Sequence, residues 1–90
     1  MQYQEIADKA THVIKTGPGF LQGITVNNAG SAWTLQVFDN ITNSGTAIAG
    51  ATAFTVPPAG TFLNYDVHFS TGLTIVTAGT TAGSITVEWY

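Results

Sequence analysis

The chain has 90 residues and no cysteine, and only 8% of its residues are charged. Most domains have about a quarter of their residues charged. A chain of this length forms one domain with a thin core, and disulfides and thiolate metal sites are excluded as supports. We therefore expect oligomerisation, or docking onto a larger assembly, to supplement the core.

The few charges are unevenly placed along the chain. Four of the seven charged side chains lie within the first 15 residues, and no Lys or Arg follows Lys15. Phosphate groups are bound mainly through Lys and Arg, so nucleic acid is not an expected partner. The N-terminal segment is polar and unlike a signal peptide, and no apolar run reaches the ~20 residues that cross a bilayer. We expect synthesis in the cytosol and no membrane partner.

The polar surface is expected to consist of Thr, Ser, Asn and small residues. Such a surface suits close protein–protein packing, because little charge has to be desolvated. Alternatively, these polar side chains alone keep a monomer in solution. The contrast in composition favours packing against partners.

The first half of the chain alternates polar and apolar residues after an ambiguous start. Residues 1–10 are predicted to form either an N-terminal arm that reaches a neighbouring subunit or a short helical turn. A weak strand at 11–16 ends at the turn at 17–19. Stronger alternation at 24–27 and 33–37 predicts two strands, separated by the turn at 27–30.

The second half contains the clearest alternation. After a polar loop at 40–45, a short edge strand at 47–49 and a weak strand at 53–56 are expected. The Pro-Pro-Ala-Gly segment at 57–60 interrupts the strands, because proline cannot donate a ladder hydrogen bond. Residues 63–69, 73–77 and 85–89 then predict three strands, with turns at 70–72 and 78–83.

These segments predict an all-β domain over residues 11–90. We expect a small antiparallel β-sandwich or jelly-roll-like domain of roughly seven or eight short strands, with a short N-terminal arm at residues 1–10. Periodicity does not give the order of the strands within the sheets.

Four segments carry a family resemblance. They are FLQGITVN at 20–27 after the Gly-Pro turn, VFDN at 37–40, PAGT at 58–61, and YDVHFSTGLTIVTAG at 65–79. Together they resemble small virion proteins of tailed bacteriophages, in particular head decoration (cement) proteins, over residues 16–90. The resemblance implies a β-sandwich or jelly-roll fold and a trimer on the capsid, with synthesis in the host cytoplasm, and it assigns no role to any single residue.

One strand carries the most specific candidate for catalysis. Asp66, His68 and Ser70 alternate along the predicted strand at 63–69 and its following turn, which places them on one face. A nucleophilic serine needs such a base and acid, but triads usually converge from separate segments. The opposite face is apolar, so a polar line is expected there without any chemistry. We therefore expect no enzyme activity.

Metal sites are equally poorly supported. Asp39, Asn40, Asn43 and Ser44 form an oxygen-rich loop, but calcium sites generally have several carboxylates. Asp66 and His68 would give only two ligands from one strand. The sequence Asn40-Ile41-Thr42 matches a glycosylation sequon, which is incidental without a secretory signal. We expect no metal and no cofactor.

The aromatic residues divide into two groups by their position in the alternation. Trp33, Tyr65, Phe69 and Trp89 fall on the apolar faces of their strands and are predicted core residues. Phe38 and Tyr90 fall on the opposite faces. Exposed aromatic side chains are enriched at protein interfaces, so Phe38 and Tyr90 are predicted to contribute to a subunit contact.

These observations lead to one expected function and two alternatives. We expect a non-enzymatic capsid decoration protein that forms a homo-oligomer, a trimer by the resemblance, and binds the major capsid protein shell on the virion surface. One alternative is a structural component of the phage tail, neck or fibre. The other is a carbohydrate-binding or adhesion module, which would need exposed aromatic side chains beside polar ones.

Overall fold

Eight antiparallel strands build the molecule. The computed structural model describes residues 1–90 and contains no helix. The strands are β1 (Gln2–Ile6), β2 (Thr11–Thr16), β3 (Gly19–Asn28), β4 (Ser31–Asp39), β5 (Thr46–Thr55), β6 (Phe62–Phe69), β7 (Gly72–Thr81) and β8 (Ser84–Trp89). No helix long and apolar enough to cross a membrane is present.

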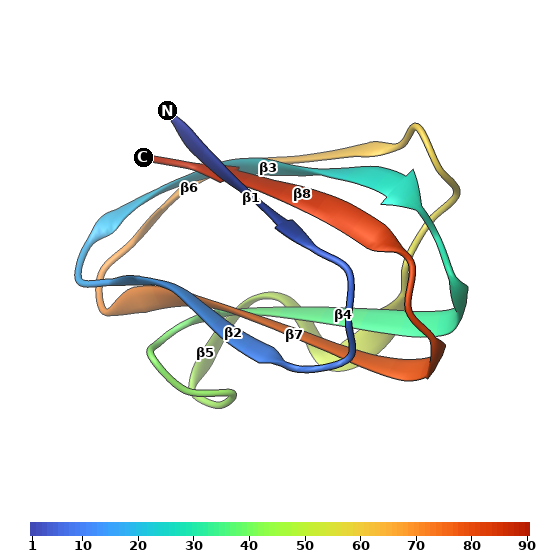
Figure 1. The fold of residues 1–90 in the computed structure, drawn as a ribbon. Helices are drawn as coiled ribbons and strands as arrows, with labels where there is room; N and C mark the ends of the chain where they lie inside the picture. The colour runs from blue at the N-terminus through green and yellow to red at the C-terminus, as the bar shows by residue number, and fades with distance from the viewer.

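The strands form two sheets packed face to face. Their orders are β1-β8-β3-β6 and β2-β7-β4-β5, drawn as the upper and lower layers in Figure 1. The antiparallel neighbours include β1 with β8, β2 with β7, β3 with β6, and β4 with β5. This nested pairing, alternating between two four-stranded sheets, is the arrangement of a jelly roll. The predicted β-sandwich is confirmed.

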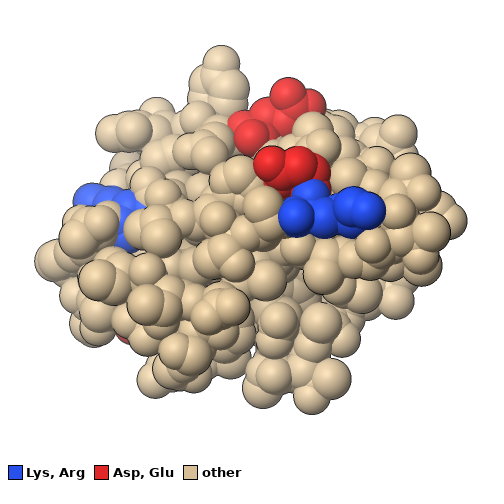
Figure 2. Space-filling view, turned by 60° about the horizontal axis from the view of Figure 1, so that its bottom comes forward, with Lys and Arg blue, Asp and Glu red and all other residues tan.

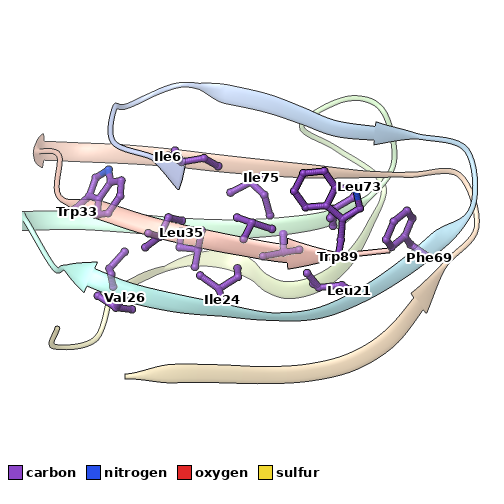
Figure 3. Close-up of a cluster of buried hydrophobic side chains, with 14 residues drawn as sticks. Ile6, Leu21, Ile24, Val26, Trp33, Leu35, Phe69, Leu73, Ile75 and Trp89 are labelled. Atoms are coloured by element: carbon purple, nitrogen blue, oxygen red, sulfur yellow. The ribbon is translucent and has the colours of Figure 1, made fainter. Parts of the chain in front are cut away.

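The core lies between the two sheets (Figure 3). Its 14 buried hydrophobic side chains come from the inward-facing positions of the strands and from one residue after β5. They are Ile6, Leu21, Ile24, Val26, Trp33, Leu35, Val37, Val56, Phe69, Leu73, Ile75, Ile85, Val87 and Trp89. The prediction of a buried position is confirmed for Trp33, Phe69 and Trp89. Tyr65 is half-buried on edge strand β6, and burial raises the pKa of its phenol.

The N-terminal residues belong to the sandwich. Residues 2–6 form β1, which pairs with β8 from Gln2 opposite Trp89 to Ile6 opposite Ile85. The predicted separate arm or helical turn at 1–10 is therefore wrong. The alternation there is hard to recognise, because Ile6 is the only buried residue of the strand.

Buried side chains anchor the link between β1 and β2, which crosses from one sheet to the other. The Trp33 Nε1–H donates to the Asp8 carbonyl oxygen at 3.1 Å, and the Thr77 hydroxyl donates to the same oxygen at 2.6 Å. The Ala10 N–H in turn donates to Thr77 Oγ1 at 3.2 Å. Because Trp33 and Thr77 are buried, these bonds satisfy polar groups that would otherwise be costly.

Several strands extend beyond the predicted boundaries, and β5 and β7 differ from the prediction in more than length. The predicted strands at 47–49 and 53–56 merge into β5, with an excursion at residues 50–53 opposite a single residue, Gln36. The Gln36 side chain holds this excursion by donating to the Gly50 carbonyl oxygen at 3.0 Å. Strand β7 continues to Thr81, so most of the predicted turn at 78–83 is strand.

Gly30 forms the tight connection between β3 and β4. Its φ is +65°, and a Cβ there would lie 2.3 Å from the Thr81 carbonyl oxygen. The Asn28 side chain accepts the Gly30 N–H at 2.9 Å. Only glycine fits both the left-handed backbone and the close approach of β7. The turn predicted from Asn and Gly at 27–30 is thus present, but it is confined to residues 29–30 because β3 continues through Asn28.

Phe38 corrects the prediction of an exposed interface residue. Its side chain is only 6% exposed, yet it is not part of the core cluster between the sheets. Val37 beside it faces that core, so Phe38 points to the outer side of the lower sheet. It pairs there with Thr74, which is completely buried, and with Ala47 on β5. Sequence alternation alone does not reveal this second, smaller buried region.

Replacement of Phe38 by alanine is predicted to destabilise the fold. Truncating a buried aromatic side chain costs about 3 kcal/mol of unfolding free energy. Tyr90, at 52% exposed, is the matched control, and Tyr90→Ala should cost less than about 1 kcal/mol. Urea unfolding measures both values. Equal small losses for the two variants would contradict the burial of Phe38.

Candidate functional site

The polar line on β6 does not form a catalytic group. Asp66, His68 and Ser70 are all exposed, and no hydrogen bond joins any two of them. Asp66 has a φ of +48° at a bulge, where Tyr65 and Asp66 together oppose Gln22 on β3. Exposed and half-buried residues still alternate along β6, so Asp66 and His68 both face outward, but neither side chain bonds to the other or to Ser70. No nucleophile is therefore activated by a base here.

The Asp39 carboxylate binds a turn of the backbone instead of a metal. It accepts hydrogen bonds from the N–H groups of Ser70 at 2.9 Å, Thr71 at 2.8 Å and Gly72 at 3.3 Å. Burial tends to raise the pKa of Asp39, but these three donors hold it below its ordinary value. Asp39 thus fixes the β6–β7 turn to the end of β4.

Asn40 and Ser44 of the oxygen-rich loop are occupied by hydrogen bonds within the loop, and the exposed Asn43 side chain makes none. Asn40 donates from Nδ2 to the Ser44 carbonyl oxygen at 2.8 Å and accepts the Ile41 N–H at 2.8 Å. Thr42 and Ser44 share a hydroxyl–hydroxyl bond of 3.1 Å. No three His, Asp or Glu side chains gather anywhere in the molecule in a way that could hold a metal ion. The loop is a self-bonded turn of the kind that Asn and Ser commonly form.

An aromatic row crosses the outer face of the upper sheet at one end. Phe20 exchanges both backbone hydrogen bonds with Tyr90 and is paired with His68 on the other side. The His68 ring meets Phe20 edge-on, with centroids 5.0 Å apart, and Tyr90 lies 5.8 Å from Phe20 on the opposite side. Three aromatic rings, from β6, from β3 and from the residue that follows β8, therefore lie side by side.

A shallow hollow lies beside this row. It has a volume of about 610 Å³ and is widely open to solvent. Its lining consists of Lys15, Pro18, Gly19, Phe20, His68, Phe69, Ser70 and Tyr90. The Lys15 ammonium donates to the Tyr90 carbonyl oxygen at 3.2 Å and so links the edge of the lower sheet to the upper one. Aromatic faces and a few polar groups around a hollow are features of small-ligand sites.

Polar side chains on the same outer face, away from the aromatic row, bind one another. Thr25 donates to the Glu88 carboxylate at 3.0 Å, and Asn27 donates to Thr86 at 2.9 Å. The Ser84 hydroxyl also donates to Glu5. These cross-strand bonds stabilise the sheet and leave few free groups for a ligand.

The outer face of the lower sheet is almost free of charge (Figure 2). Lys15 and Asp39 are the only Lys, Arg, Asp or Glu residues within β2, β7, β4 and β5. Both are used in backbone hydrogen bonds at the end of the sandwich. The exposed part of β5 and β7 consists of Thr, Ala and Gly. This uncharged face is therefore a surface of Thr, Ala and Gly over β5 and β7.

Comparison with known proteins gives no match: no family model, no curated protein and no solved structure corresponds to this chain.

The sequence predicts only part of these surfaces. Tyr90 is exposed, as its position in the alternation indicates, but alternation does not identify Phe20 and His68 as its neighbours. Their proximity depends on the order β8-β3-β6, which periodicity cannot give. The one sequence signal for this row is Phe20, an aromatic residue at an outward position beside the core residue Leu21.

Asp39 is predicted to contribute to stability in a pH-dependent way. Loss of its bonds to the β6–β7 turn in Asp39→Ala should cost about 1 kcal/mol, since hydrogen bonds to a partly exposed charged group are weakened by solvent. Because the folded pKa is lowered, this contribution is complete above the unfolded pKa of about 3.9 and is lost as the pH falls below it.

Urea unfolding between pH 7 and pH 2.5 measures this effect. Asp39→Asn keeps an acceptor oxygen without the charge, so its stability should fall less on acidification than that of the unchanged protein. Identical pH profiles for the two proteins would contradict the role of the carboxylate.

Proposed function

We propose that this protein is a non-enzymatic structural component of a phage virion, a decoration protein on the outer surface of the capsid. The observation that carries the proposal is the uncharged outer face of the sheet β2-β7-β4-β5. A face of this kind can be covered by another protein with little loss of charge hydration. The resemblance of residues 16–90 to cement proteins supports the same role.

The mechanism is additive. Each copy contacts more than one subunit of the major capsid protein shell, so its binding energy is gained only in the assembled state. Several weak contacts made by one oligomer raise the overall affinity without any strong single contact. A folded jelly roll suits this role, because little conformational entropy is lost when a preformed surface docks.

The tail, neck or fibre of the virion is the alternative location. The surface chemistry is compatible with either, and the copy number separates them. A decoration protein is expected in many copies per particle, and a tail component in few. Quantitative protein staining of purified virions, normalised to the major capsid protein, distinguishes these outcomes.

A charge placed on the uncharged face is predicted to abolish capsid binding. Ala78 is exposed near the C-terminal end of β7, a central strand of the lower sheet. Ala78→Glu would require a carboxylate to be desolvated on docking. Co-sedimentation with capsid shells that lack the protein should show at least a tenfold weaker affinity. The matched control is Asn64→Glu, an equal charge on exposed edge strand β6 of the other sheet, which should bind normally.

Two results would contradict the proposal. The first is failure of the unchanged protein to bind the shells at any concentration. The second is equal binding by Ala78→Glu and the unchanged protein, when urea unfolding curves show that both proteins are folded.

Carbohydrate binding is a second candidate, and the aromatic row beside the hollow is the observation that favours it. Tyr90 is exposed next to Phe20 and His68, and Ser70 and Lys15 supply polar groups on the rim. Sugar rings stack on aromatic faces while their hydroxyls bond to such groups. The jelly-roll fold by itself does not decide between the two functions.

A glycan array tests this candidate. Binding of any glycan that is lost in Tyr90→Ala and retained in Tyr3→Ala, an exposed tyrosine on β1 outside the hollow, would support it. No binding across the array would dismiss it. Neither result depends on capsid binding.

A further inference from the structure

The four edge strands of the sandwich differ in regularity. They are β1 and β6 in the upper sheet and β2 and β5 in the lower sheet. Free edges can pair with strands of other molecules, and proteins commonly block them with bulges, prolines or charges. Three of these four edges are interrupted, and β1 is not.

The interruptions are visible in the pairing of each strand. Strand β2 has a register shift between Val13 and Lys15, and β6 has its bulge at Tyr65 and Asp66. Strand β5 has the excursion opposite Gln36 and a second shift beside Phe38. Strand β1 pairs with β8 in one unbroken register over all five residues and contains no Pro, Gly or Lys.

The direction of the free backbone groups on β1 follows from its neighbours. Tyr90 turns both its N–H and its C=O toward Phe20 on β3. Backbone groups alternate sides along a strand, so Trp89, Val87 and Ile85 turn theirs toward β1. Their partners in β1 are Gln2, Gln4 and Ile6, and these are the hydrogen-bonded pairs.

Tyr3 and Glu5 therefore direct their N–H and C=O groups away from the sheet. No other residue of the chain bonds to these groups, and both residues are exposed, Tyr3 at 77%. Two donors and two acceptors lie in a row along an edge that has no bulge and no proline, and Glu5 is its one charged residue. Such an edge is a template for one more antiparallel strand.

We propose that β1 pairs antiparallel with β1 of a second copy of this chain, joining two upper sheets into one continuous eight-stranded sheet. The two-fold axis lies at Gln4, which places Tyr3 of each copy opposite Glu5 of the other. Both pairs are of the hydrogen-bonded kind, so all the outward backbone groups of Tyr3 and Glu5 find partners.

Side-chain chemistry selects this register. A two-fold axis at Glu5 would place two carboxylates directly opposite each other, which is destabilising. An axis at Tyr3 would place the outward N–H and C=O groups of Glu5 opposite the residue that precedes β1 in the other copy, outside the strand. With the axis at Gln4, each Tyr3 phenol lies beside a Glu5 carboxylate, and the two Gln4 amides can bond to each other.

The sequence of β1 favours a second copy of the same chain as the partner that pairs with this edge. The same five residues supply complementary backbone groups and complementary side chains when turned by 180°, so the contact is isologous. This contact joins two copies and does not depend on the capsid function. A trimer of the kind that the family resemblance implies would have to use another surface.

A single cysteine tests the pairing, because the chain contains none of its own. At the two-fold axis the Gln4 positions form a non-hydrogen-bonded pair, whose Cα atoms lie about 4.5 Å apart, within the range of a disulfide. Gln4→Cys should therefore give a covalent dimer on mild oxidation. Asn64→Cys on exposed edge strand β6 is the control and should crosslink at least tenfold more slowly.

A second variant tests the contact without a crosslink. Gln4→Lys places two ammonium groups opposite each other at the axis and leaves the bonds to β8 intact. In analytical ultracentrifugation the unchanged protein should sediment as two copies of 9.4 kDa, and Gln4→Lys as one. Asn64→Lys should sediment like the unchanged protein.

Two outcomes would overturn the proposal. One is crosslinking of Gln4→Cys no faster than Asn64→Cys. The other is a mass that Gln4→Lys does not change, whether that mass is of a monomer or of a larger oligomer.

Discussion

The packing of two apolar sheet faces is the constraint on which the rest of this structure depends. With 90 residues and no disulfide, the chain has only one layer of side chains between its sheets to hold it together. Every strand must therefore keep an alternation of inward and outward residues. The outward positions are left free to vary, and their chemistry determines what the molecule can bind.

Those outward positions differ between the two sheets. On the upper sheet, cross-strand bonds such as Asn27 to Thr86 occupy the polar groups, and aromatic rings gather at one end around Phe20. On the lower sheet, charges are absent from the open face, and Asp39 is used to hold a turn. Neither face assembles a base and a nucleophile. The molecule thus offers surfaces for contact, and we base the proposed structural role on the lower one.

The fold could be predicted from the sequence because its main signal is local. The alternation at 63–69 and at 85–89 identifies strands without any knowledge of their neighbours. Prediction from the sequence is wrong where contacts with neighbouring strands decide whether a residue is buried or a segment forms a strand. Phe38 is buried on the outer side of a sheet, and β1 is held by β8 although only Ile6 of its five residues is buried. The aromatic row and the free edge of β1 both depend on the order of the strands in the sheet. The periodicity of the sequence gives no information about that order.

The thin core, the uncharged face of the lower sheet and the open edge of β1 all lead to one claim, that several copies of this chain associate. It is tested most directly by the midpoint of thermal unfolding measured over a hundredfold range of protein concentration. A native state that contains several copies is stabilised by mass action, so the midpoint should rise steadily with concentration. A midpoint that stays constant over that range would show that the folded state is a monomer and would contradict the claim.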